Sequence, residues 1–378
     1  PGHPGQYGIF HLAWKRYQVF PTIDRIDKFY FTHVDMAANN GAGLVREKNQ
    51  LLLLDTFADN LTAVRHGNGR DWWLIAPRRG TDTLFLFLFQ PDGIHGPLIR
   101  QTGLRRSNQL HTFGQAVFSP DGTRYVYADT YTGVHILEFD RCRGTFSCPM
   151  QLPYPGKDEG PCGAAISAGG QYLYVSTPTQ LYQYDLRVKD IESSKTLTGE
   201  YDGFQDPFPA GFYQQMLAPN GKIYMTATNG QRFLHVIHQP DSAGATCDFR
   251  QHDLALPSYN GSTLPNFPHF RLYDLPYSPC DTAGVDAPKG LEVLWRPDNK
   301  IRLLGNPGSE RVFVLLPPCA RGEIRVYSLA GVLLTKYPVS CEKTVELDCS
   351  LLPAAAYIVT YAPSDGSKPL SAKLVVAR

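Results

Sequence analysis

A short pattern of apolar and polar positions recurs along the first part of the chain. A turn containing glycine is followed within three residues by a run in which aromatic and aliphatic side chains alternate with other residues. The clearest copy is FSPDGTRYVYAD at 118–129, and ISAGGQYLYVST at 166–177, LAPNGKIYMTAT at 217–228, HGNGRDWWLIAP at 66–77 and the fainter PGQYGIFHL at 4–12 repeat it. Alternation of this kind, entered from a tight turn, predicts β-strands.

The spacing of the five copies indicates a repeated structural unit. Their glycines lie at positions 5, 69, 122, 170 and 221, which gives intervals of 64, 53, 48 and 51 residues. A period near fifty residues in a chain of strands is typical of propeller blades, each a four-stranded sheet that buries its faces against neighbouring blades. We therefore predict an all-β fold containing a β-propeller with about five blades.

Five blades of this size are fewer than most closed rings contain, so we expect six or seven in the full protein. The chain begins at Pro1 without an initiator Met or a leader segment, which indicates a processed or partial chain. We expect the N-terminal blade or blades to be missing here, or to be supplied by another fragment that completes the ring.

Within the first unit the pattern predicts strands at 7–13, 28–34 and 51–54, with a long insertion at 36–49. Helix signals are few in the whole chain. Only the segment 188–198, VKDIESSKTLT, is expected to form a short helical turn.

The composition of the chain changes after residue 272. The stretch that follows is rich in Pro, Gly and Asp, which predicts an interdomain linker at 274–300. Beyond it, six short strand-like runs predict an immunoglobulin-like β-sandwich at 301–378. The β-propeller is assigned to 1–273.

Composition and charge exclude some classes of function. With 36 Lys and Arg against 35 Asp and Glu, the net charge of +1 gives no reason to expect a nucleic-acid partner. The 21 Tyr, 20 Phe, 34 Gly and 30 Pro agree with a β-rich chain full of turns. The chain contains no run of about eighteen apolar residues, so the sequence predicts no membrane-spanning helix.

Eight cysteines are scattered along the chain without a C-x-x-C pair. This scatter favours disulfides formed in an oxidising compartment over zinc or haem ligands, with buried free thiols as the alternative. Cys142 and Cys148 could close a loop between two strands. Cys247 and Cys280 bracket the last blade and could tie down its end.

The segment RHGNGRDWW is the densest group of polar side chains in the repeats. Arg65, His66, Arg70, Asp71 and Trp72 could form a site for an anion or a sugar. The interpretation that we favour is structural, because polar side chains at blade turns commonly bond to neighbouring strands while an indole fills the space between blades.

No other motif indicates chemistry. The chain has no G-x-S-x-G motif, and its histidines and aspartates lack the spacing of a zinc or calcium site. We therefore predict no cofactor, no metal and no catalytic residues.

The C-terminal segment carries a set of motifs in a fixed order. Asn306-Pro307 precede the first predicted strand, IRVYSLAGVLL at 324–334 places Gly331 in a turn, LDCSLLPAAAYIVTY from 347 contains Leu352 and Tyr357, and SAKLVVAR contains Lys373. This segment resembles the type A sorting domain of the Bacteroidota type IX secretion system. It departs from the family at Ala355 and Ala356, where a glycine is usual before the aromatic residue.

The resemblance implies a partner and a location. The partner would be the type IX translocon or an outer-membrane carrier that binds the C-terminal domain. The protein would then be extracellular, at the cell surface and associated with the outer membrane. In many members of the family the domain is removed after export.

The first four-fifths of the chain is similar to a family of Bacteroidota surface propellers whose biochemical role is not established. The similarity lies in LTAVRHGNGRDWWLI at 61–75, FSPDGTRYVY at 118–127, YDGF at 201–204, and LPNFPHFRL at 264–272. The similarity implies a β-propeller fold, a location at the cell surface, and an opening blade before the equivalent of Pro1. It does not identify the ligand.

Three sites match the Asp-(Ser/Thr)-aliphatic sequence on which Bacteroidota attach O-glycans, as the resemblance implies. They are centred on Thr83, Ser242 and Thr282. Thr282 is the first candidate because it falls in the predicted linker.

Two functions are compatible with these sequence features. In the first, the propeller is a non-catalytic binding or structural component of a surface assembly, with a glycan or a surface protein as its ligand. In the second, it is a hydrolase or lyase that processes polysaccharide or peptide with residues from its central channel. We favour the first, because no paired carboxylates, catalytic triad or metal ligands recur where the channel would be lined.

Overall fold

The computed structural model describes residues 3, 5–17, 23–109, 114–156, 160–275, 278, 280, 301–304, 311–316, 320–340, 344–350, 352–364 and 368–376. The chain divides into two compact units. The first is formed mainly by Pro1–Asp274 and the second mainly by Asp286–Arg378.

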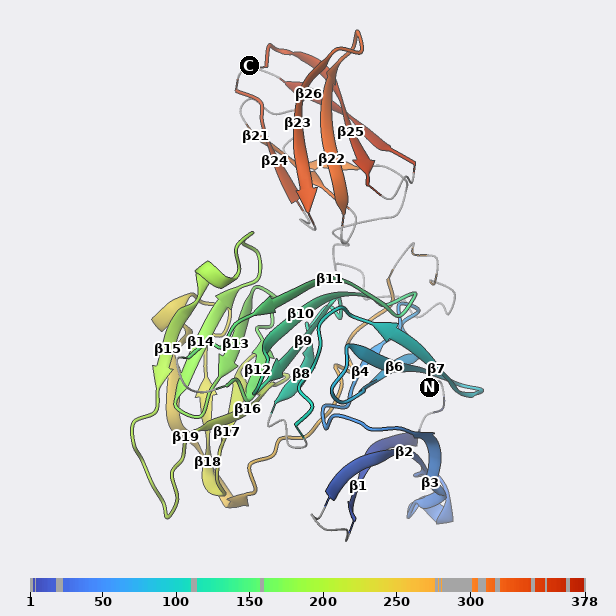
Figure 1. Ribbon diagram of the computed structural model, residues 1–378, viewed down its shortest axis with the longest axis vertical. Coiled ribbons are helices and arrows are strands. Elements are labelled where there is room, and N and C mark those ends of the chain that lie inside the picture. Colours follow the sequence, from blue (N-terminus) through green and yellow to red (C-terminus); the bar gives the residue numbers. More distant parts are fainter. Residues whose placement is uncertain are drawn as a thin grey trace. The chain divides into compact units, whose positions relative to one another are not determined.

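The described part of the first unit consists of five antiparallel sheets that follow one another in chain order (Figure 1). In each sheet the strands are neighbours in the order of the sequence. The first sheet contains β1 (Gln6–Tyr17), β2 (Ile23–Asp35) and β3 (Leu44–Leu54). The second contains β4 (Thr62–Arg65), β5 (Trp72–Pro77), β6 (Thr83–Gln90) and β7 (Gly93–Gln101).

The remaining three sheets of this unit are also four-stranded. Their strands are β8 (Gln115–Phe118), β9 (Arg124–Asp129), β10 (Gly133–Asp140) and β11 (Thr145–Leu152); β12 (Gly163–Ile166), β13 (Tyr172–Ser176), β14 (Gln180–Asp185) and β15 (Thr196–Glu200); and β16 (Phe212–Leu217), β17 (Ile223–Ala227), β18 (Gln231–Ile237) and β19 (Phe249–Asn260). Strand β8 lies beside β4 and β12, and β12 also lies beside β16. Successive sheets that meet at their first strands are propeller blades, so the predicted β-propeller is confirmed.

Four of the five marker glycines occupy the same place in their blades, and Gly5 shares their backbone conformation. Gly5, Gly69, Gly122, Gly170 and Gly221 have φ values of 76°, 69°, 71°, 70° and 81°, a left-handed conformation that favours glycine. In the last four, the glycine N–H donates to the carbonyl three residues earlier, that of His66, Ser119, Ser167 or Ala218. Each of these four turns leads into the second strand of its blade. Strand β1, which follows Gly5, therefore corresponds to a second strand rather than a first.

Blades pack face to face through the alternation predicted from the sequence. In β9, Tyr125 and Tyr127 belong to the core shared with the second sheet, which includes Trp73 of β5. The intervening Val126 and Ala128 belong to the core shared with the fourth sheet. Both faces of β9 are therefore buried, as the two-residue repeat of a strand allows.

The first sheet packs on the second through phenylalanine rings. The ring centroid of Phe10 lies 5.4 Å from that of Phe89, and Phe29 lies 5.2 Å from Phe87. These tilted and edge-on contacts are the geometry that aromatic pairs prefer. They anchor β1 and β2 to β6.

The prediction of a long insertion at 36–49 is wrong about its length. Strand β3 begins at Leu44, so the connection from β2 is short and contains only the 3-10 helix η1 (Asn39–Gly41). Residues 44–50 are exposed, and most of them are polar. They lack the alternation of apolar and polar residues by which a half-buried strand is predicted. The helical turn expected at 188–198 is present as the 3-10 helix η2 (Glu192–Ser194).

After β19 the chain returns to the second and third sheets, and we call residues 264–274 the strap. The amide Nδ2 of Asn266 donates to the carbonyl of Leu61 at 2.8 Å, and the ring of Phe270 lies 5.5 Å from that of Trp72. Leu272 is buried in the core that contains Val64. The strap therefore links the last blade to earlier ones.

The second unit is a β-sandwich of two sheets that share one core. One sheet has the order β20-β21-β24 and the other β23-β22-β25-β26. The strands are β20 (Arg302–Leu304), β21 (Arg311–Leu315), β22 (Arg321–Ser328), β23 (Leu333–Ser340), β24 (Thr344–Asp348), β25 (Ala355–Pro363) and β26 (Leu370–Val376). Val312 and Leu347 of the first sheet are packed in one cluster with Ile324 and Val359 of the second.

Candidate functional site

The polar motif predicted between β4 and β5 forms one connected cluster centred on Asp71, which is fully buried. Its carboxylate accepts hydrogen bonds from Arg70 Nε at 2.7 Å, Asn68 Nδ2 at 2.8 Å and Gln90 Nε2 at 2.9 Å. Burial by itself would raise the pKa of Asp71, but the hydrogen bonds from Arg70, Gln90 and Asn68 outweigh it and hold the pKa below its usual value.

Both ring nitrogens of His66 are engaged in the same cluster. Its Nδ1 accepts the backbone N–H of Asn68 at 3.1 Å, so Nε2 carries the proton and donates to the carbonyl of Cys142, also at 3.1 Å. Cys142 lies in the turn between β10 and β11. An imidazole held in this way links two blades and has no nitrogen left to act as a general base.

The other two predicted residues face the strap. The guanidinium of Arg65 lies 4.7 Å from the ring of Trp72, and Phe270 packs against the same indole. Burial lowers the pKa of Arg65. The five predicted residues therefore lie together, and their described contacts are directed at neighbouring strands and the strap. This geometry favours the structural interpretation of the motif.

Arg141 completes the cluster and carries no signal in the sequence. It is 2% exposed, and its guanidinium donates to the backbone carbonyls of Arg65, Asp121, His66 and Tyr273. Burial lowers its pKa to about 10. One arginine thus joins the β4–β5 turn, the FSPDG turn and the strap, which are far apart in the sequence.

The cysteines divide into two groups. Cys142, Cys148 and Cys280 are disulfide-bonded. Cys247 is a free thiol, so the prediction that it forms a disulfide is wrong. The side chain is buried in the core between the last two blades, where it packs with Tyr174 and Phe212, and burial raises its pKa. The pairing of Cys142 with Cys148 stays a prediction.

The β-sandwich contains most of the residues of the predicted sorting-domain motif. Gly331 forms the turn between β22 and β23 with φ 81°, and its N–H donates to the carbonyl of Ser328 at 3.0 Å. Tyr357 is buried and its hydroxyl donates to the carbonyl of Pro353, while Leu352 packs against the core. Lys373 is exposed on β26. Asn306 and Pro307 lie outside the described residues.

The three O-glycosylation candidates differ in exposure. Thr83, at the start of β6, is 9% exposed, which leaves no room for a glycan on the folded blade and argues against this site. Ser242 is half-buried, and its carbonyl accepts a hydrogen bond from Gln183. Thr282 lies outside the described residues.

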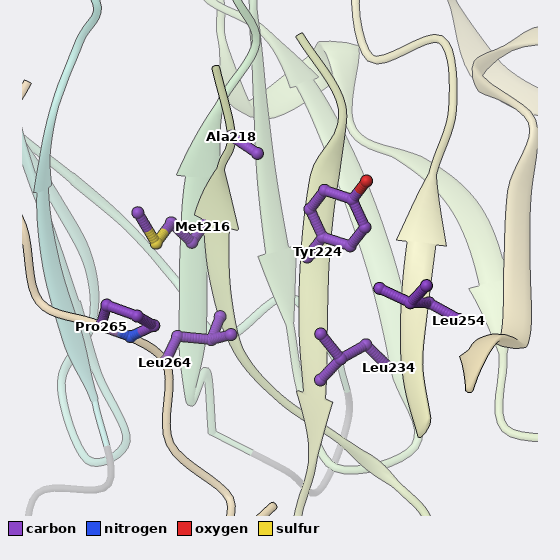
Figure 2. Close-up of a pocket in the computed structure, with 7 residues that line it drawn as sticks. All are labelled: Met216, Ala218, Tyr224, Leu234, Leu254, Leu264 and Pro265. Carbon is purple, nitrogen blue, oxygen red and sulfur yellow. The ribbon is translucent and has the colours of Figure 1, made fainter. Parts of the chain in front are cut away.

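An apolar hollow of about 250 Å³ lies on the last blade (Figure 2). It is formed on the face of the sheet opposite to the one that packs on the fourth blade. The residues around it are Met216, Ala218, Tyr224, Leu234, Leu254 and, from the strap, Leu264 and Pro265. These side chains offer one hydroxyl and no acid or base, so the hollow is suited to apolar contact and not to proton transfer.

The first sheet also has an exposed apolar face. Tyr7 of β1 is 59% exposed and lies across from Val34, which lies across from the exposed Val45. Ile9 and Leu51 extend the same face and are about half exposed. Both end blades of the described propeller therefore carry apolar side chains on a face that no described neighbouring sheet covers.

The described residues contain neither a metal-binding cluster nor a membrane-spanning helix. No group of three or more His, Cys, Asp or Glu side chains within this part of the chain could hold a metal ion. Among the same residues, no helix has the length and apolar character needed to cross a membrane.

No known protein family matches the chain, and no curated protein matches it. Some solved structures resemble the chain at low sequence identity. A functionally unknown protein from Desulfotomaculum acetoxidans is 17% identical, with a TM-score of 0.34 over 64% of this chain and 71% of that chain. A candidate 6-phosphogluconolactonase from Bacteroides uniformis is 10% identical, with a TM-score of 0.40 over 98% of this chain and 97% of the other.

A second candidate 6-phosphogluconolactonase, from Bacteroides fragilis, is 11% identical over 100% of this chain and 97% of the other, again with a TM-score of 0.40. At such identities and TM-scores these likenesses carry no conclusion about activity or substrate. The function must be argued from the residues of this chain.

Proposed function

We propose that the protein is a non-catalytic binding and structural component of a surface assembly, in which the propeller binds a partner polypeptide through its end blades. The observation that carries the proposal is the pair of exposed apolar faces, one on the first sheet and one on the last. Contiguous apolar surface of this kind marks interaction sites in soluble proteins.

In the interior blades, an apolar face of this kind is covered by a neighbouring sheet. The second, third and fourth sheets each contribute side chains to two cores, one on either side. The end sheets have the same alternation of apolar residues but contribute to one core each. The partner that fits is therefore a polypeptide that forms one or more further blades. It would be either an N-terminal fragment of the same protein or a separate chain.

The arrangement of the first sheet supports the same partner. Because β1 corresponds to the second strand of a blade, the matching first strand would pair along the edge of β1 that faces away from β2. A strand added to an open sheet edge contributes backbone hydrogen bonds as well as apolar contact. A blade-forming segment would satisfy both the edge and the face.

The location that we propose is the cell surface, with the C-terminal β-sandwich as the export signal recognised by the type IX translocon or an outer-membrane carrier. The resemblance of this unit to type A sorting domains supports the proposal, as does its compact core. A glycan ligand on the propeller, and an enzymatic role in processing polysaccharide or peptide, are the alternatives that experiment must exclude.

The binding proposal is tested on the chain and its natural precursor together. Ile9→Glu and Leu254→Glu place a charge on the two end faces, and Leu329→Glu, in an exposed turn of the second unit, is the control. We expect the end-face variants to lose a blade-forming partner in native mass spectrometry, while the control retains it. Equal retention by all three variants, or turnover of a polysaccharide or peptide panel by the wild-type chain, would overturn the proposal.

Export is tested separately in a Bacteroidota host. A precursor lacking 301–378 should remain in the periplasm, while the intact precursor reaches the surface in a strain with a working translocon. Surface delivery of the truncated form would contradict the proposed role of the second unit and would leave the binding proposal standing.

A further inference from the structure

Arg106 lies between β7 and β8 and is 2% exposed. Its backbone N–H donates to the carbonyl of Thr81 at 3.1 Å, and its guanidinium lies 5.0 Å from the ring of Tyr127 in β9. None of its three guanidinium nitrogens has a hydrogen-bond partner among the described residues. A buried charged donor without partners is strongly destabilising.

Two further buried groups beside Arg106 also have unused hydrogen-bonding capacity. The hydroxyl of Tyr125 lies close enough to the Arg106 guanidinium for the two groups to interact, and it has no other partner in the described chain. Nδ1 of His135 in β10 has no partner there. The ring of His135 lies 5.8 Å from that of Tyr127, and its Nε2 is 3.2 Å from Thr132 Oγ1. If the threonine hydroxyl donates to Nε2, then Nδ1 carries the proton and is a donor.

The local charges are consistent with this assignment. Burial first, and then the positive charge of Arg106, lower the pKa of His135 to about 4, so the imidazole is neutral at neutral pH. The carboxylate of Asp129, which interacts with His135, accepts backbone N–H groups from Ser107, Tyr131 and Thr132. It forms no ion pair with Arg106 within the described residues.

Arg141 is a buried arginine of the same propeller whose guanidinium does have hydrogen-bond partners. It is buried to the same extent as Arg106, yet it donates to four backbone carbonyls. The contrast between the two side chains indicates that the guanidinium of Arg106 has a partner other than a protein group.

We propose that Arg106, Tyr125 and His135 bind a small monovalent anion, chloride being the probe, between the second and third blades. The guanidinium supplies the compensating charge, and the hydroxyl and imidazole N–H are neutral donors. The ligand would have to be small, because Tyr125 and His135 are fully buried. The site lies within the propeller and does not depend on the partner proposed above.

The test uses thermal unfolding of the whole chain in sodium chloride and in sodium gluconate at equal ionic strength. We expect the wild-type Tm to rise with chloride in a saturable way, because an ion that binds only the folded state stabilises it. Arg106→Met should abolish the response. Arg143→Met, at an exposed position in the β10–β11 turn, removes the same charge and should keep it.

Crystals grown in sodium bromide provide a readout that does not need the variant to fold. We expect an anomalous peak within hydrogen-bond distance of the Arg106 guanidinium. A Tm that is the same in chloride and gluconate, a chloride response retained by Arg106→Met, or a bromide crystal without a peak at this position would each overturn the proposal.

Discussion

Arg141 donates a hydrogen bond to the backbone carbonyl of Tyr273, 132 residues further along the chain. The same guanidinium binds the carbonyls of Arg65 and His66 in the β4–β5 turn. The strap is therefore attached to two blades through one buried side chain. Since the strap follows the last blade, this contact connects the end of the propeller sequence with its second and third sheets.

Replacing Arg141 by methionine should strongly destabilise the first unit. The change preserves much of the side-chain volume but leaves four backbone carbonyls without their donor, and we expect a loss of about 3 kcal/mol or more in the free energy of unfolding. Urea unfolding at neutral pH measures it. The control is Arg143→Met, because Arg143 is 72% exposed and should change the stability by less than about 0.5 kcal/mol. Equal effects in the two variants would contradict the role of Arg141.

Asp71 should make the stability of the propeller depend on acid pH. Its folded-state pKa is lower than the usual 3.8, so the stabilisation is present above the unfolded value and is lost as the pH falls through the folded value. We expect Asp71→Asn to remove this acid dependence and to cost about 2 kcal/mol at neutral pH, because the new amide faces donors.

The measurement is urea unfolding between pH 2 and pH 7. Asp92→Asn is the control, since Asp92 is exposed and its carboxylate accepts a hydrogen bond from the exposed His95. An acid limb of the same slope in Asp71→Asn and wild type would show that Asp71 is not responsible for it.

Two marker glycines allow backbone strain to be separated from packing. Gly122 and Gly170 have φ values of 71° and 70°, so alanine is strained equally at both. A Cβ at Gly122 would lie 2.7 Å from Leu272 Cδ2 and 2.9 Å from Arg141 Cδ, whereas at Gly170 it would meet nothing within 4 Å. We expect Gly170→Ala to cost about 1 kcal/mol and Gly122→Ala about 2 kcal/mol more.

Thermal and urea unfolding of the two alanine variants give the comparison directly. A larger loss is expected at Gly122 because the added methyl group pushes against the strap. Identical losses would mean that the strap does not pack on this turn in solution.

The free thiols can be counted chemically. Without reductant, the folded protein should protect Cys162, Cys247 and Cys349 from alkylation because all three are buried. Unfolding in denaturant should expose them, whereas Cys142, Cys148 and Cys280 should react only after reduction. Peptide mass spectrometry distinguishes the two groups, and a Cys247 that needs reductant would refute its assignment as a thiol.

The repeat and the strands that build it follow from local features of the sequence. The turn glycines at 69, 122, 170 and 221 and the alternating residues after them act locally, because a left-handed turn needs glycine and a strand buried on both faces needs apolar side chains. Only the end of β3, at 51–54, was predicted, because residues 46–50 before it are exposed and polar.

How the repeats are joined, and which polar groups find hydrogen-bond partners, depends on the three-dimensional packing of the blades. The bond from Arg141 to Tyr273, the unpartnered guanidinium of Arg106 and the free thiol of Cys247 depend on which segments meet in space. The local pattern carries no information about such contacts, because the residues that meet are separated by one or more blades. The sequence also does not show which blades have an exposed face. The apolar residues of the end blades alternate as they do in a buried strand, and only the neighbouring sheets distinguish the two cases.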